Sequence, residues 1–108
     1  MKPSELLREA RDRVTKPGAW LRGSRVQIDG PGCVVDHLRD AATDAHPRAV
    51  TNWLDRDDGY RALKALHYAA NERNWSSAQG LNDHNPTRLW GVVAMLGRAI
   101  RRLESEGK

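Results

Sequence analysis

The stretch LWGVVAMLGRAIRRL, residues 89–103, decides the fold class of this protein. Its apolar residues recur at spacings of three and four, which places them on one face of a helix. That stripe consists of Leu89, Val92, Val93, Leu96, Ile100 and Leu103. Asn85 followed by Pro86 is typical of an N-cap and a first helical position, so we expect the helix to begin there. An apolar stripe of this length needs other apolar faces to pack against.

Three other segments show the same helical pattern. Residues 4–14 place their apolar side chains on one face and stop before a Pro-Gly pair. Residues 33–42 form a second helix with the same periodicity. The third segment is split: Pro47 opens a short helix with Leu54 pointing inward, and Asp58 caps the helix that follows.

These patterns predict a mainly α protein. Four or five short amphipathic helices would pack their stripes into one compact bundle, and we treat residues 1–108 as a single helical domain. The irregular residues 18–32 include an alternating segment at residues 25–29, which leaves open one small β element.

The net charge of +4 is unevenly spread along the chain. Residues 1–28 carry a net charge of +4, residues 29–58 of −4 and residues 59–108 of +4, which indicates distinct basic and acidic faces. The single cysteine cannot form an internal disulfide, no apolar run reaches the roughly 20 residues of a membrane span, and the first residues lack the apolar centre of a signal peptide. We therefore expect a cytoplasmic protein that does not associate with membranes.

Two sets of short motifs resemble a known family. The first set is Leu6-Leu7-Arg8-Glu9-Ala10, Pro17-Gly18-Ala19-Trp20 and Cys33 opening a helix; the second is Leu81-Asn82-Asp83, Thr87 and Arg98-Ala99-Ile100. In this order, and over nearly the whole chain, they resemble family 6197 of the domains of unknown function, which occurs in actinobacteria and in their phages. The resemblance implies a compact domain and an actinobacterial or phage setting, hence the host cytoplasm for a phage-encoded protein, and it implies no activity.

Two positions depart from that family pattern. The family has a Gly-Ala pair in the helix after its cysteine, where this chain has Asp36-His37-Leu38. Trp90 stands three residues after Thr87, where an acidic residue would complete a capping box. The packing of residues 33–42 and the start of the last helix are therefore expected to differ from the family pattern.

The densest polar cluster is Asn82, Asp83, His84 and Asn85. An enzyme would use Asp83 and His84 as an acid–base pair. The alternative is turn chemistry, in which Asn and Asp side chains bond to nearby backbone. We favour the structural interpretation because no third residue within reach in the sequence orients the pair. The sequence therefore leans against an enzyme, and an enzyme centred on Asp83 and His84 stays as the second alternative.

One face of the helix at residues 33–42 carries Cys33, Asp36, His37 and Asp40. Cys33 and His37 are four residues apart and could both reach a metal ion, but no other histidine shows paired ligand spacing. A thiol at a helix start could also be reactive. We favour a solvated polar face with a half-buried cysteine, and we expect no metal and no cofactor.

Basic residues on the first and last helices suggest nucleic-acid binding as an alternative function. The arginines are Arg8, Arg11, Arg98, Arg101 and Arg102. They could contact phosphates if the two helices are adjacent. Acidic residues lie among them, and no DNA- or RNA-binding motif accompanies them.

The leading hypothesis is a non-enzymatic module that binds a protein partner, namely a host protein. Tryptophan is common at binding hot spots, and Trp75 and Trp90 are the best candidates for an exposed anchor. Tryptophan side chains usually pack in or beside the core, so we expect at most one of the four to be exposed.

Overall fold

The computed structural model describes residues 1–23, 30–49 and 51–108. These residues form five α-helices and one short 3-10 helix: α1 (Pro3–Val14), α2 (Val34–Ala45), η1 (Trp53–Asp55), α3 (Asp57–Asn71), α4 (Ala78–Asp83) and α5 (Leu89–Ser105). The prediction of a mainly α fold is confirmed. The small β element expected at residues 25–29 lies outside the described residues; within them, Trp20 and Gly32 form an isolated bridge.

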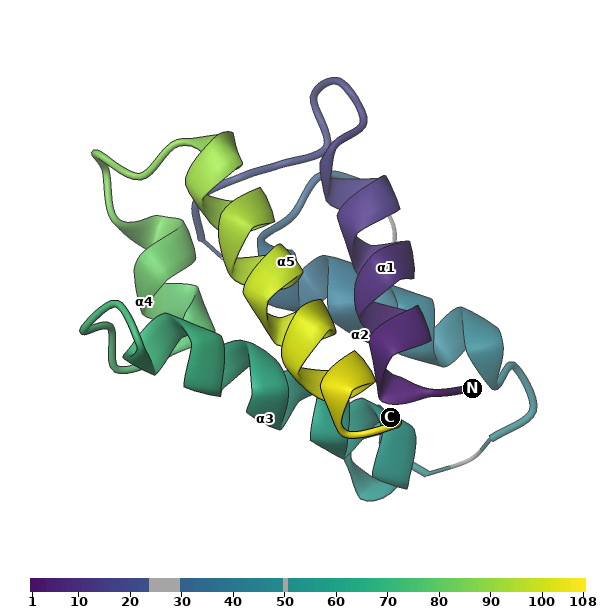
Figure 1. Cartoon of the computed structure of the whole chain (residues 1–108). Helices are drawn as coiled ribbons and strands as arrows, with labels where there is room; N and C mark the ends of the chain where they lie inside the picture. The colour runs from purple at the N-terminus through teal and green to yellow at the C-terminus, as the bar shows by residue number, and fades with distance from the viewer. Residues whose placement is uncertain (24–29, 50) are drawn as a thin grey trace.

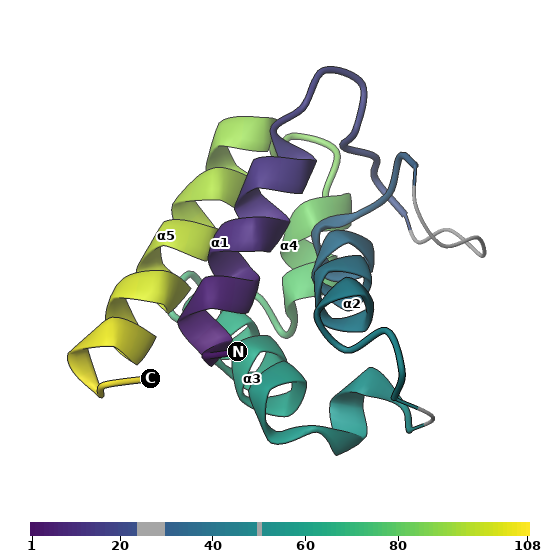
Figure 2. The ribbon, with the colours of Figure 1, turned by 90° about the vertical axis from the view of Figure 1, so that its right-hand side faces the viewer.

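The longest helices pack around α1. Helix α1 lies beside α5 and also contacts α2 and α3, as Figures 1 and 2 show from two sides. Helix α3 packs against α5, and the short α4 contacts α2 and α3 near the start of α5 (Figure 1). The end of the chain returns to the start of α1, where the Ser4 hydroxyl donates a hydrogen bond to the Lys108 carbonyl at 3.0 Å.

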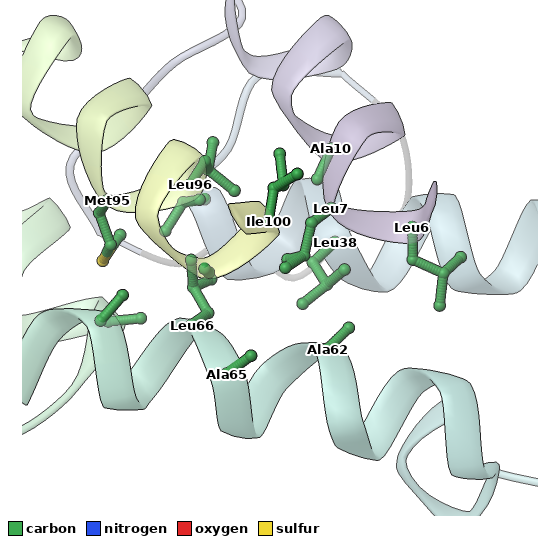
Figure 3. Packing of buried hydrophobic residues seen from close by; sticks show 14 of the residues in the cluster. Leu6, Leu7, Ala10, Leu38, Ala62, Ala65, Leu66, Met95, Leu96 and Ile100 are labelled. Carbon is green, nitrogen blue, oxygen red and sulfur yellow. The ribbon is translucent and has the colours of Figure 1, made fainter. Parts of the chain in front are cut away.

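The core between these helices combines leucines with alanines. Leu7, Leu38, Leu66 and Leu96 are completely buried and meet between α1, α2, α3 and α5 (Figure 3). Small side chains such as Ala62 leave room for the helices to approach closely. Most of the stripe predicted on residues 89–103 faces this core, since Val92, Leu96, Ile100 and Leu103 are buried and Leu89 packs against them. Val93 does not belong to the core cluster, and Met95 and Ala99, which the stripe did not include, are buried in it.

The last helix begins later than the sequence predicts. Its first residue is Leu89 and its N-cap is Arg88, not Asn85. A helix capped by Asn85 would use the Asn85 carbonyl to accept the Leu89 N–H. That carbonyl instead accepts a hydrogen bond from Arg22 at 2.8 Å, so a side chain distant in sequence holds these residues as a loop.

The middle of the chain also differs from the prediction. The short helix is η1, not a helix opened by Pro47, and Leu54 is exposed although it was expected to point inward. Helix α3 has Arg56 as its N-cap, so Asp58 lies inside the first turn and bonds to His46 at 2.7 Å. The turn from η1 into α3 is tight enough that a Cβ at Gly59 would overlap the carbonyl oxygen of η1's first residue.

Candidate functional site

A buried asparagine joins the parts of the chain around α4. The side-chain oxygen of Asn82 accepts hydrogen bonds from Trp20 Nε1 at 2.7 Å and from the Val34 backbone N–H at 3.0 Å. Its nitrogen donates to the Leu21 carbonyl at 3.0 Å and to Asp83 Oδ1 at 2.9 Å. Both ends of the amide are therefore used to connect α4 with the loop after α1 and with the start of α2.

Asp83 and His84, the residues of the enzyme alternative, face different partners. Asp83 Oδ1 accepts the backbone N–H of Gly23 at 2.7 Å. The ring of His84 lies against Trp75, with ring centroids 4.7 Å apart. No hydrogen bond joins the Asp83 and His84 side chains in the described residues, so the structure does not show the acid–base contact that this alternative needs.

Arg22 fixes the loop between α4 and α5. Its Nη2 donates to the carbonyls of Asn85 at 2.8 Å and Thr87 at 2.6 Å, and its Nε donates to the carbonyl of His84 at 3.4 Å. The guanidinium also lies over the Trp20 ring, 4.9 Å from its centroid. The loop that leads into α5 is therefore held by charge-assisted hydrogen bonds, and the first turn of α5 starts from a defined position.

A surface groove lies at this end of the molecule, where the chain after α3, helix α4 and the first half of α5 meet. We call it the Trp90 groove, and its volume is about 380 Å³. Its lining includes Arg73, Trp75, Leu81, Arg88, Trp90 and Arg98. No aspartate or glutamate lines it. The groove therefore combines apolar and aromatic walls with arginines.

Trp90 is the exposed tryptophan of the chain, with 76% of its surface accessible. The other three, Trp20, Trp53 and Trp75, are half-buried and pack against the core. The sequence named Trp75 and Trp90 as candidate anchors, and the structure brings these two into one groove. Trp75 forms part of the wall, whereas Trp90 projects into solvent.

The terminal-helix arginines do not all share one environment. Arg8 forms an ion pair with Glu104 at 2.6 Å. Arg102 stacks on Tyr68, 3.7 Å from the ring centroid, and lies 3.6 Å from Glu106. Arg11 is half-buried and Arg101 exposed. Arg98 belongs instead to the Trp90 groove.

Sequence reasoning missed two arginines of the groove, Arg73 and Arg88. Each stands two residues before a tryptophan that was identified as a candidate, in the triplets Arg73-Asn74-Trp75 and Arg88-Leu89-Trp90. That repeated spacing is weak evidence for a shared site, because it does not show whether the two triplets lie close together in the folded chain. Their meeting depends on α4, a six-residue helix that the sequence analysis did not predict.

The polar face of α2 is buried, which corrects the prediction of a solvated face with a half-buried cysteine. Cys33 is fully buried, and Asp36, His37 and Asp40 are almost completely so. Asp36 accepts the Cys33 N–H at 3.1 Å, and His37 Nε2 lies 2.7 Å from the Ala19 carbonyl. The loop after α1 therefore covers this face. No group of three or more His, Cys, Asp or Glu side chains among the described residues is arranged to hold a metal ion.

Sequence comparison places the chain in a family. The model of the Family of unknown function (DUF6197) matches residues 1–102, and the chain therefore belongs to this family. No curated protein and no solved structure matches the chain. Among the described residues, no helix has the length and apolar character needed to cross a membrane.

Proposed function

We propose that this protein is a non-enzymatic interaction module that docks a partner protein in the Trp90 groove. The observation that carries the proposal is the indole of Trp90, three-quarters exposed on the rim of a groove with apolar walls. An exposed tryptophan offers a large apolar surface with little side-chain entropy to lose, which suits a binding anchor. On this proposal the interaction takes place in the cytoplasm, and for a phage-encoded protein the partner is a host protein in the host cytoplasm.

Rigidity around the groove supports this proposal. Asn82 holds helix α4, which follows Trp75, against the loop after α1 through a buried hydrogen bond, and Arg22 holds the loop before Trp90 through charge-assisted ones. A surface that is already ordered loses less conformational entropy on binding than a mobile one. On this proposal the Asn82-Asp83 motif supports the binding surface and performs no chemistry of its own.

Nucleic-acid binding is the alternative function. It is favoured by the presence of Arg73, Arg88 and Arg98 in one groove with no acidic neighbour in its lining. It is disfavoured by Arg8 and Arg102, because carboxylates already pair with both. Single-stranded nucleic acid is also usually held by several stacking rings along a basic track, and Trp90 is the only tryptophan that the groove exposes.

Affinity capture of partners tests the proposal. The tagged protein would be incubated with actinobacterial lysate, with and without nuclease treatment, and retained proteins would be identified by mass spectrometry. We expect the wild-type chain to retain a specific protein that Trp90→Ala loses. The matched control is Tyr60→Ala, which removes another exposed aromatic ring, 54% accessible, outside the groove.

The two variants make the outcome decisive. Both positions are exposed, so each substitution is expected to change stability by no more than about 0.5 kcal/mol. Retention that survives Trp90→Ala would contradict the proposed function. Capture of nuclease-sensitive material alone would transfer support to the nucleic-acid alternative.

A further inference from the structure

Resting on the proposed function, we infer that the Trp90 groove takes an acidic segment of its partner, in which a glutamate or aspartate stands beside a large apolar side chain. The inference concerns the chemistry of the partner, whereas the proposed function concerns only the place where it binds. It is drawn from the charges, the hydrogen-bonding capacity and the walls of the groove.

The charges in the groove all have the same sign. Arg73, Arg88 and Arg98 line it, and no carboxylate shares the lining. Elsewhere on the described surface, arginines such as Arg8, Arg13 and Arg61 are paired with acidic side chains. A groove whose cations are not offset by its own lining is complementary to an anionic partner.

Arg98 retains hydrogen-bonding capacity that the described residues do not use. Its Nη2 donates to the Ala69 carbonyl at 3.1 Å, which anchors the guanidinium at the end of α3. Its Nε is buried and has no hydrogen-bond partner among the described residues. Burial, followed by the charge of Arg73, lowers the pKa of Arg98. The charge of Glu72 opposes this shift in part, and a partner carboxylate beside the half-buried Arg98 side chain would add a further favourable charge interaction.

The walls of the groove select for an apolar neighbour. Leu81 and Ala94 line it together with the rings of Trp75 and Trp90. Its volume of about 380 Å³ is near the lower end of the range for ligand pockets, so it suits a short segment of chain. A peptide carrying both a carboxylate and an apolar side chain would satisfy the arginines and cover the exposed indole.

A protein segment fits these features better than a nucleic acid does. The His84 ring lies against the half-buried Trp75, with ring centroids 4.7 Å apart, so Trp90 is the one tryptophan of the groove that is exposed for stacking. A strand of nucleic acid needs successive stacking surfaces and a continuous line of cations. Three arginines around one small hollow are better suited to one or two carboxylates.

Matched peptides test the inference on the full chain. Three peptides of about twelve residues share the same leucines and serines and carry glutamate, glutamine or lysine at the remaining positions. An oligothymidylate of similar length is the nucleic-acid probe. Affinities are measured by calorimetry at low salt, and NMR follows the indole N–H of Trp90 and the Nε–H of Arg98.

We expect the glutamate peptide to bind at least about tenfold more tightly than the glutamine peptide, the lysine peptide to bind least, and the glutamate peptide to shift both NMR signals. Arg73→Gln/Arg88→Gln should weaken the glutamate peptide by roughly 5- to 30-fold and leave the glutamine peptide within about twofold. Both arginines are exposed, so this variant should fold. The control Lys16→Gln/Arg48→Gln removes the same charge at exposed positions outside the groove.

Several results would overturn the inference. Equal affinity for the glutamate and glutamine peptides, or the same loss in the control variant, would show that the groove does not select acidic chemistry, while the Trp90-dependent capture could still stand. Absence of binding by the glutamate peptide, or tighter binding of oligothymidylate, would also refute the inference. Failure of the proposed function itself is recognised separately, as capture that survives Trp90→Ala.

Discussion

Replacing Asn82 by alanine tests whether the Asn82-Asp83 motif is structural. The substitution leaves the Val34 N–H and Trp20 Nε1–H without their acceptor and the Leu21 carbonyl without its donor. A buried donor left unsatisfied costs about 1–3 kcal/mol. Val34 is fully buried and bears the full cost, whereas Trp20 is half-buried and exposed Leu21 can bond to water, so we expect a total of about 3 kcal/mol.

Urea denaturation, followed by tryptophan fluorescence, measures this loss. With a typical slope of about 1.5 kcal/mol per molar urea, the midpoint of Asn82→Ala should fall by about 2 M. Asn85→Ala is the matched control: were Asn85 the N-cap of α5, its loss would cost about 1 kcal/mol. Because Arg88 is the N-cap, we expect a change of no more than about 0.5 kcal/mol. A midpoint shift below about 0.5 M for Asn82→Ala, or a larger loss for Asn85→Ala, would refute the reasoning.

Two further perturbations probe the fold. Gly59→Ala should destabilise the protein by about 1–3 kcal/mol, because the added Cβ would overlap the Trp53 carbonyl oxygen. At Gly97 an added Cβ meets only the movable end of an arginine side chain, so Gly97→Ala should stabilise α5 by up to about 1 kcal/mol. Thermal unfolding of both variants tests this, and equal changes in melting temperature would contradict it. Burial lowers the pKa of His67, whose Nδ1 accepts the Ala78 N–H, so the folded state favours the neutral ring. The contribution of His67 to the free energy of unfolding should therefore be fully present above about pH 6.5 and be lost as the pH falls toward the lowered pKa. His67→Gln should make the free energy of unfolding less dependent on pH in this range, and an unchanged dependence would contradict the assignment.

The position of Trp90 illustrates how the family motif and the candidate site are related. Asn82 and Asp83 lie in α4, and they bond to the loop after α1, whose residues do not line the groove. Arg22 of that same loop then holds the segment that enters α5. Asn82 and Asp83 are therefore linked to the groove through the loop after α1, whereas His84 of the same polar cluster lines the groove itself.

The candidate site could be predicted only in part from the sequence. Trp75 and Trp90 were identifiable because large aromatic residues stood outside the clear core stripe. Arg73 and Arg88 were not identifiable, because the chain has 18 Lys and Arg residues and the sequence does not show which of them lie close together in the fold. Arg98 was assigned to a patch with Arg8, but on the folded chain it lies in the groove and Arg8 pairs with Glu104.

By itself the sequence determined the helical class and the buried face of α5, because a helix repeats every 3.6 residues and that period is a local property. Tertiary structure decided where α5 begins, since the carbonyl of Asn85 bonds to Arg22, which is 63 residues away in the sequence. It also decided that the polar face of α2 is buried. Burying a polar side chain is costly unless it is hydrogen-bonded, and the Ala19 carbonyl in the loop after α1 provides a partner for His37. The Trp90 groove likewise depends on the tertiary structure. Its arginines and Trp90 are visible in the sequence, but only contacts in the folded chain bring them together.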